Sequence, residues 1–189
     1  MPDEHITQPL FCHIATPAPT VRAIEVRLSQ KTGNGLTLGY TLWGDATRLR
    51  IPQQQLPSRS DGLWEHTCFE AFIGLRGERA YREFNFSPSG QWAAYAFSDY
   101  RQHADTSPDF DPLETTTRLL PDRFELEVCL PYGALPANPD GKLWQIGLSA
   151  VIETHDTNDG QLSYWALHHP SAKPDFHHRD AFVLELPSL

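Results

Sequence analysis

The sequence predicts an all-β fold: an antiparallel β-sandwich of the jelly-roll kind, with long loops and little helix. Two observations carry this prediction. Apolar and polar residues alternate with a period of two in many short segments, which is typical of strands that bury one face. In addition, sixteen prolines and twelve glycines interrupt the 189 residues too often for long helices. Eight or more strands at this spacing indicate a sandwich or barrel, and we expect one domain over residues 1–189.

The first elements are an arm and a hairpin. We expect residues 1–15 to form a loosely attached arm. Apolar side chains recur at every second position in residues 24–28 and again in residues 36–42. Between these segments lies Gly33-Asn34-Gly35, a strong turn signal. The two segments are therefore predicted to pair as a hairpin.

A meander of three strands follows, predicted over residues 63–74, 80–87 and 90–98. Short segments rich in glycine, serine and proline join these strands and are typical of tight turns. The same alternation then recurs four times before the C-terminus. These later strands are expected at residues 124–130, 144–152, 162–167 and 181–186.

Charge and cysteine content limit the classes of function. The 24 acidic and 15 basic residues give a net charge of −9, which repels phosphate backbones and anionic lipid surfaces, so we expect neither nucleic acid nor membrane as a partner. Cys12, Cys68 and Cys129 form no CxxC pair, and the first residues lack an apolar signal core. No apolar run reaches the 18 or so residues of a membrane span. These features favour a soluble protein of the reducing cytoplasm.

The segment 63–101 interleaves aromatic rings with polar groups. Alternation along its strands predicts that Phe69, Ile73, Phe84 and Phe86 fill the core. The opposite face then carries rings and hydrogen-bonding groups together, which suits a ligand that is polar but has flat apolar patches. The residues predicted to face outward are Trp64, His66, Glu70, Glu83 and Asn85.

A sugar is the ligand class that best matches this chemistry, because its C–H faces stack on rings while its hydroxyls need paired donors and acceptors. The aromatic candidates for stacking are Trp64, Trp92, Trp165, Tyr95 and Tyr164. Any single tryptophan is as readily explained as part of the core. In a cytoplasmic protein the target would be a soluble sugar such as a nucleotide sugar, whose phosphate Arg101 or Lys173 could bind.

A basic, histidine-rich loop, residues 168–179, is the second informative feature. His168, Lys173, Asp175 and His177 are candidates to meet a ligand held over the sheet. Adjacent histidines on an extended chain point apart, and their spacing matches no standard zinc pattern. The sequence leaves open whether this loop binds ligand, binds a metal, or only uses its imidazoles to hold its own backbone.

Three segments together carry a family resemblance: LWEHTCFEAFIG, YREFNFSPSGQWAAYAFSDYR and SYWALHHPSAKPDFHHRDAFVLEL. They resemble the DOMON-like ligand-binding superfamily, which includes the type-nine carbohydrate-binding modules. Within it, they resemble a bacterial branch found with UDP-N-acetylmuramate dehydrogenase-like proteins. The resemblance implies an antiparallel β-sandwich with a ligand-binding face for a sugar or haem, and related carbohydrate modules often carry a structural calcium ion.

The cofactor options can be weighed on this chain's residues. Haem in related domains takes a methionine with a histidine or lysine, whereas the only methionine here is Met1, which argues against haem. A bis-histidine pair of His66 with His168 or His177 stays open. Calcium also stays open, through oxygen ligands in two loops: Asp105, Asp109 and Asp111, and Asp156 and Asp159.

Two other classes of function are alternatives to a binding module. The sequence contains no GxSxG, GxxxxGK[ST], GxGxxG or HExxH motif. Glu70 and Glu83 could still serve glycoside hydrolysis if they faced each other across neighbouring strands. The aromatic face could instead dock a partner protein or a second copy in a homodimer. We predict a non-catalytic domain that binds a saccharide-like ligand through Trp64, His66, Glu70, Glu83, Asn85, Trp92, Arg101, Trp165, His168, Lys173, Asp175 and His177.

Overall fold

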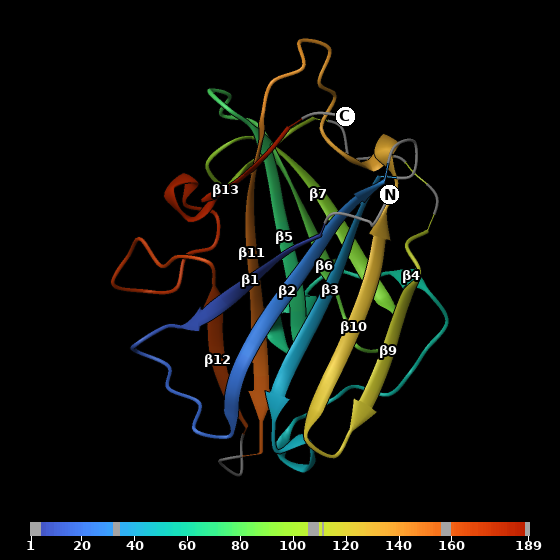
Figure 1. Cartoon of the computed structure of the whole chain (residues 1–189), viewed down its shortest axis with the longest axis vertical. Helices are drawn as coiled ribbons and strands as arrows, with labels where there is room; N and C mark the ends of the chain where they lie inside the picture. The colour runs from blue at the N-terminus through green and yellow to red at the C-terminus, as the bar shows by residue number, and fades with distance from the viewer. Residues whose placement is uncertain (1–4, 32–34, 106–109, 111, 156–159, 188–189) are drawn as a thin grey trace.

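The computed structural model describes residues 5–31, 35–105, 110, 112–155 and 160–187. Strands dominate this part of the chain, and its helices are short 3-10 turns. Two layers of strands pack face to face, with β2, β3, β10 and β9 crossing in front of β5, β6, β7 and β11 (Figure 1). The β-sandwich with little helix that the sequence predicts is thereby confirmed.

Sheet A has the strand order β1-β2-β3-β10-β9, and all its pairings are antiparallel. The predicted hairpin is present, and its turn at residues 32–34 lies outside the described residues. The strands of sheet A are β1 (His5–Cys12), β2 (Val21–Lys31), β3 (Gly35–Gly44), β9 (Thr115–Leu120) and β10 (Arg123–Leu130).

Sheet B has the order β4-β7-β6-β5-β11-β12, with β13 added to β11 and β8 to β7. Its pairings are antiparallel except for the two-residue strand β4, which runs parallel to β7. The predicted meander corresponds to β5, β6 and β7. The strands of sheet B are β4 (Ser58–Arg59), β5 (Cys68–Leu75), β6 (Tyr81–Phe86), β7 (Gln91–Asp99), β8 (Gln102–His103), β11 (Trp144–Thr154), β12 (Gln161–Ala166) and β13 (Leu184–Leu186).

Two predicted boundaries are wrong for reasons of local backbone conformation. The strand expected from residue 63 begins at Cys68, because Gly62 at φ 75° turns the chain into a 3-10 turn, η2 (Leu63–Glu65). The strand expected from residue 181 begins at Leu184, after a second 3-10 turn, η4 (Arg179–Ala181). Two further turns, η1 (Ala46–Arg48) and η3 (Tyr132–Ala134), lie in connections.

The expected loose arm is also wrong. Residues 5–10 pair with β2, whereas Phe11 and Cys12 pair with β12, so β1 passes from one sheet to the other. Leu10 is buried in the core. Residues 5–12 therefore form a structural strand that joins the two layers.

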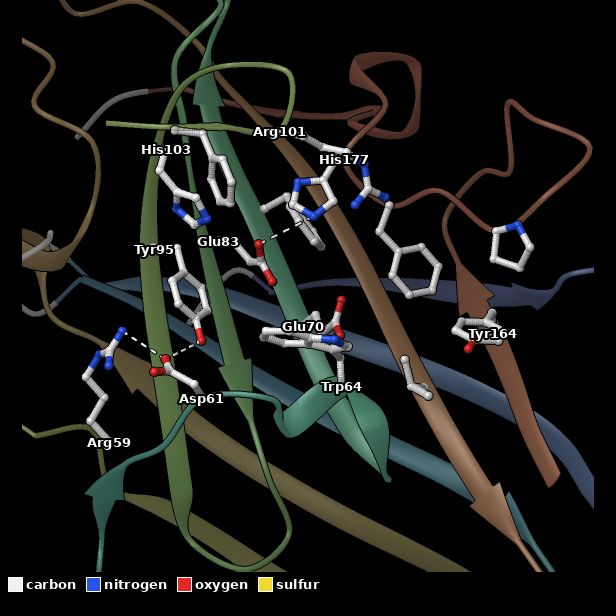
Figure 2. A pocket seen from close by; sticks show the side chains of 15 residues that line it. Arg59, Asp61, Trp64, Glu70, Glu83, Tyr95, Arg101, His103, Tyr164 and His177 are labelled. Atoms are coloured by element: carbon white, nitrogen blue, oxygen red, sulfur yellow. Dashed lines mark hydrogen bonds and ion pairs between the residues drawn. The ribbon is translucent and has the colours of Figure 1, made fainter. Parts of the chain in front are cut away.

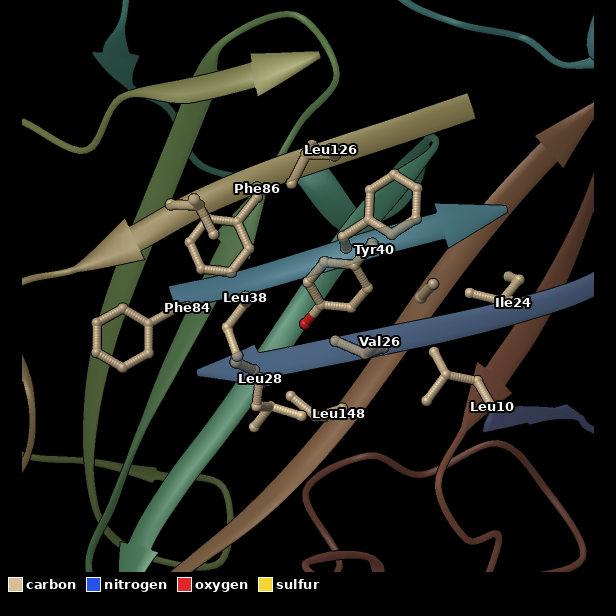
Figure 3. Packing of buried hydrophobic residues seen from close by; sticks show 14 of the residues in the cluster. Leu10, Ile24, Val26, Leu28, Leu38, Tyr40, Phe84, Phe86, Leu126 and Leu148 are labelled. Atoms are coloured by element: carbon tan, nitrogen blue, oxygen red, sulfur yellow. The ribbon is translucent and has the colours of Figure 1, made fainter. Parts of the chain in front are cut away.

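The core lies between the sheets and is built by the predicted alternation. Val26, Leu38 and Leu126 of sheet A face Phe84, Phe86 and Leu148 of sheet B (Figure 3). Phe69 and Ile73 of β5 are fully buried in the same cluster, as predicted.

Two of the candidate tryptophans also belong to this core. Trp92 is 7% exposed and Trp165 is 6% exposed, and both are members of the core cluster. The Trp165 indole N–H donates to Ser163 Oγ at 3.0 Å. Neither ring is available to stack on a ligand, so their assignment to the binding face is wrong.

Candidate functional site

The outer face of sheet B, turned away from the core, carries a cavity of about 500 Å³. Loops cover this face from three sides, and the side chains of β5, β6 and β7 that alternate with the core residues form its floor (Figure 2). Cavities of this size are typical of small-molecule sites. The cavity is therefore where the predicted aromatic and polar face can meet a ligand.

Two buried carboxyl groups lie at the floor. Glu70 of β5 and Glu83 of β6 are 3% and 5% exposed, and they stand diagonally on neighbouring strands, because Glu70 pairs with Asn85 and Phe72 pairs with Glu83. Glu70 Oε2 accepts from Ser149 Oγ at 3.4 Å. Glu83 Oε1 accepts from the Asn85 amide at 2.8 Å.

Burial makes both carboxyl groups reluctant to ionise. Desolvation raises the pKa of Glu70 well above its ordinary value of 4.5, and the charge of Glu83 adds to this effect. Desolvation likewise raises the pKa of Glu83 to about 7, although the Asn85 amide and the charge of Arg101 oppose it. Burial thus favours the protonated form of both carboxyl groups, and near pH 7 the Glu83 carboxyl group is only partly ionised.

His177 lies above these carboxyl groups in a fixed orientation. The Tyr81 hydroxyl accepts from the Arg101 backbone N–H at 3.1 Å and shares a hydrogen bond with His177 Nδ1 at 2.8 Å. The other ring nitrogen, Nε2, faces Glu83 Oε2 at 3.6 Å. Burial lowers the pKa of His177 to about 4, so this imidazole is neutral at pH 7.

One wall of the cavity combines rings with an ion pair. Trp64 of η2 is 42% exposed and meets Tyr95 of β7 edge to face, with ring centroids 6.0 Å apart. The Tyr95 hydroxyl donates to Asp61 at 2.7 Å, and Asp61 pairs with Arg59 at 3.1 Å. The Tyr95 hydrogen bond lowers the pKa of Asp61. This wall offers an indole surface beside a carboxylate and a guanidinium.

The opposite wall is the wall loop, residues 168–183, together with Tyr164 of β12. Pro174 and Phe176 contribute apolar surface to the cavity, and Phe176 lies 6.0 Å from the Tyr164 ring. The loop begins at an anchor on β1, where His169 Nε2 donates to the Phe11 carbonyl oxygen at 2.8 Å.

Arg179 anchors the other end of the wall loop to sheet B. Its guanidinium donates to the Leu75 carbonyl oxygen at 3.2 Å and to Gln145 Oε1 at 2.9 Å, and its Cζ lies 4.6 Å from the centroid of the Phe182 ring. Gly74 leaves the space for this side chain, because a Cβ there would overlap the guanidinium.

Arg101 closes the upper rim from the turn between β7 and β8. Its φ is 53°, a left-handed conformation that non-glycine residues rarely adopt. Its side chain pairs with Asp175 at 3.1 Å, and Asp175 also accepts from the Tyr100 hydroxyl at 2.8 Å. Strained residues of this kind concentrate at functional sites. His103 lies on the same rim, stacked on Phe97 with centroids 4.6 Å apart.

The structure brings five of the predicted site residues together around the cavity: Trp64, Glu70, Glu83, Arg101 and His177. Tyr95 and Tyr164, two of the five stacking candidates, line it as well. Asn85 is fully buried beneath Glu83, and Asp175 supports Arg101, so these two lie behind the lining. Lys173 and His168 are on the wall loop but do not line the cavity.

His66 is not where the sequence predicts. It follows η2 instead of lying within a strand, and its Nδ1 pairs with Glu153 Oε2 at 2.9 Å. His66 lines a separate groove, which it shares with Trp64 and Asp61, and not the cavity over sheet B. The haem pairs that combine His66 with His168 or His177 are therefore not assembled within one cavity.

Sequence reasoning missed several lining residues. Phe72 and Phe97 share a face with Glu70 and Tyr95 by simple alternation, so the period of two could have identified them. Arg59, in the two-residue strand β4, and Asp61, just after it, lie in a stretch without periodicity, where no such signal exists.

The described residues hold no group of three or more His, Cys, Asp or Glu side chains close enough to bind a metal ion. This includes the whole histidine-rich loop. Of the calcium candidates, Asp109, Asp111, Asp156 and Asp159 lie outside the described residues. In the same part of the chain, no helix is both long and apolar enough to cross a membrane.

Comparisons with known proteins define the class of fold. No protein-family model matches the sequence, and no curated protein matches it at a significant level. The structure is similar to that of a candidate carbohydrate-binding protein from Bacteroides uniformis, with a TM-score of 0.66 and 17% identity over 96% of this chain and 85% of that one. This similarity shows a shared fold.

Weaker matches are two structures of a family 9 carbohydrate-binding module from Caldicellulosiruptor kristjanssonii, one with cellotriose and one with glucose. Each has a TM-score of 0.46 and 14% identity over 84% of this chain. The match covers 71% of the chain in the cellotriose complex and 74% of the chain in the glucose complex.

Proposed function

We propose that this chain is a non-catalytic domain that binds a small saccharide-like ligand in the cavity over sheet B. The observation that carries the proposal is the composition of this one cavity. Trp64, Tyr95 and Tyr164 offer ring surfaces for the C–H faces of a sugar. Glu70 and Glu83 offer fixed hydrogen-bonding groups for its hydroxyls, and the volume of about 500 Å³ admits one or two sugar rings.

Two further points support the proposal. The fold is shared with a protein described as a candidate carbohydrate-binding protein. The sequence also resembles the DOMON-like superfamily, and membership in its branch found with UDP-N-acetylmuramate dehydrogenase-like proteins is part of the proposal. We place the ligand among soluble intracellular sugars, in keeping with the cytoplasmic location expected from the composition.

Calorimetric titration with a panel of monosaccharides and disaccharides tests the proposal. Trp64→Ala removes the most exposed ring of the cavity and should weaken binding about tenfold, which corresponds to ~1.4 kcal/mol. Tyr132→Ala is the matched control, because this ring is 44% exposed and lies outside the cavity. Equal loss of affinity in both variants, or no binding of any sugar, would contradict the proposal.

Glycoside hydrolysis is a second candidate function, favoured by the presence of both Glu70 and Glu83 in one cavity. Burial raises the pKa of both groups, which suits a general acid but disfavours the second, ionised carboxylate that the reaction also needs. Release of nitrophenol from a panel of aryl glycosides would establish it. Sugar binding without turnover would establish the binding domain.

A further inference from the structure

We propose that the cavity selects a saccharide that carries a protonated amine, and that the carboxyl groups of Glu70 and Glu83 hold its ammonium group. This inference rests on the proposed function, because it names the class of sugar for the same cavity. Three observations carry it: acidic groups without a cationic partner at the floor, guanidinium groups already paired at the rim, and aromatic faces around both.

The floor is acidic and contains no cation of its own. Among the described residues, the Glu70 carboxyl group has one hydrogen-bond donor, the Ser149 hydroxyl at 3.4 Å, and its Oε1 has none. Glu83 meets the neutral Asn85 amide and the neutral His177 ring. Figure 2 shows the oxygens of Glu70 and Glu83 directed into the cavity. Such deeply buried carboxyl groups are normally protonated or paired with a cation, and the ammonium group of a ligand would supply the cation that the floor lacks.

The two guanidinium groups of the cavity are already paired with other acids. Arg101 pairs with Asp175 at 3.1 Å, and Arg59 pairs with Asp61 at 3.1 Å. Each rim cation thus has its own carboxylate, which leaves Glu70 and Glu83 as the excess acidic groups. An anionic ligand such as a phosphorylated sugar finds no unpaired cation in these two guanidinium groups, whereas an ammonium group would favour the ionised form of the floor carboxyl groups and pair with it.

Aromatic faces complete the environment of a bound ammonium group. Phe72 and Tyr95 line the cavity beside the two carboxyl groups, and Phe97 lies on the same face of β7. A cation over such rings gains about 0.5–2 kcal/mol when it is shielded from water. The same rings stack on the C–H faces of the sugar, so an amino sugar satisfies the rings and the acids together.

Titration with four probes at pH 7 tests the inference: glucosamine, glucose, N-acetylglucosamine and choline. Glucosamine should bind at least tenfold more tightly than glucose, because glucosamine carries a protonated amine and glucose carries no charge. N-acetylation should abolish this advantage. Glu70→Gln and Glu83→Gln should each reduce the ratio of glucosamine affinity to glucose affinity about tenfold, with both affinities measured in the same variant.

Glu78→Gln is the control, because this exposed acid lies on the turn between β5 and β6, paired with Lys142, outside the cavity. Glutamine resembles the protonated carboxyl group in shape, and thermal unfolding verifies that each variant is folded. If glucose and glucosamine bind equally, the inference fails and the proposed function stands. If choline binds and no sugar does, the proposed function fails. If no probe binds, both fail.

Discussion

Replacing Glu83 with glutamine should change how the stability of the protein depends on pH. The carboxyl group lies at the floor of the cavity, and its pKa rises from 4.5 to about 7 through desolvation. Below pH 4.5 it is protonated in the folded and unfolded states alike, so it causes no difference. As the pH rises from 4.5 to 7, the unfolded chain ionises first, and stability is lost. Glutamine cannot ionise and should remove this loss.

The expected magnitude follows from the two pKa values. One pKa unit corresponds to about 1.4 kcal/mol, so ionised Glu83 costs the folded protein on the order of 3 kcal/mol at pH 8. The side chain is 7% exposed, which means that solvent does little to reduce this cost. The free energy of unfolding of Glu83→Gln should therefore exceed that of the natural chain by on the order of 3 kcal/mol more at pH 8 than at pH 4.

Urea denaturation of both proteins at several pH values between 4 and 8 measures this difference. His177 acts in the opposite sense, because its pKa is lowered to about 4 and stability is lost as the pH falls from 6.5 to 4. Its contribution is present in both proteins and largely cancels when one curve is subtracted from the other. Parallel curves over the whole range would refute the reasoning about Glu83.

Three other predictions concern the fold around the cavity. Gly74→Ala should lower stability by about 1–3 kcal/mol and weaken ligand binding, because the new Cβ displaces Arg179 and with it the wall loop. Differential scanning fluorimetry measures the first effect and titration with ligand measures the second. Tyr40→Phe should cost about 1 kcal/mol in urea denaturation, because the buried hydroxyl donates to a main-chain carbonyl oxygen of β5 at 2.8 Å. In the folded protein, a thiol reagent should modify exposed Cys129 rapidly and Cys68 only after unfolding, because Cys68 is fully buried and burial raises the pKa of its thiol.

Within a single strand, alternation correctly predicts which side chains point into the core and which point away from it. Phe84 and Phe86 are core, and Glu83 lines the cavity, as expected. The same rule would have excluded Trp92, because it stands three residues from Tyr95 in β7 and must point the other way. Tyr164 and Trp165 are adjacent in β12, so only one of them can face the cavity. Trp92 and Trp165 were assigned to the binding face because they are aromatic, without first checking on which face of the strand each position lies.

Other features of the site depend on long-range contacts that no local pattern encodes. Arg59 and Asp61 reach the cavity because β4 runs alongside β7, a pairing between segments about thirty residues apart. His66 turns to Glu153, 87 residues away in the chain. Residues 5–12 join the two sheets because they pair with both β2 and β12, and their few apolar residues give little sequence signal. None of these positions can be predicted until the pairing partner is known.

The wall loop is fastened to the sandwich at two anchors, and these anchor residues are not the side chains that line the cavity. His169 fastens the loop to β1, and Arg179 fastens it in the notch at Gly74. Pro174 can then be exchanged to reshape one side of the cavity at a lower cost to folding than Phe176, which packs against the buried cluster of Phe72 and Phe182. The domain is thus a scaffold with an interchangeable side, suited to laboratory selection of binders for other small ligands.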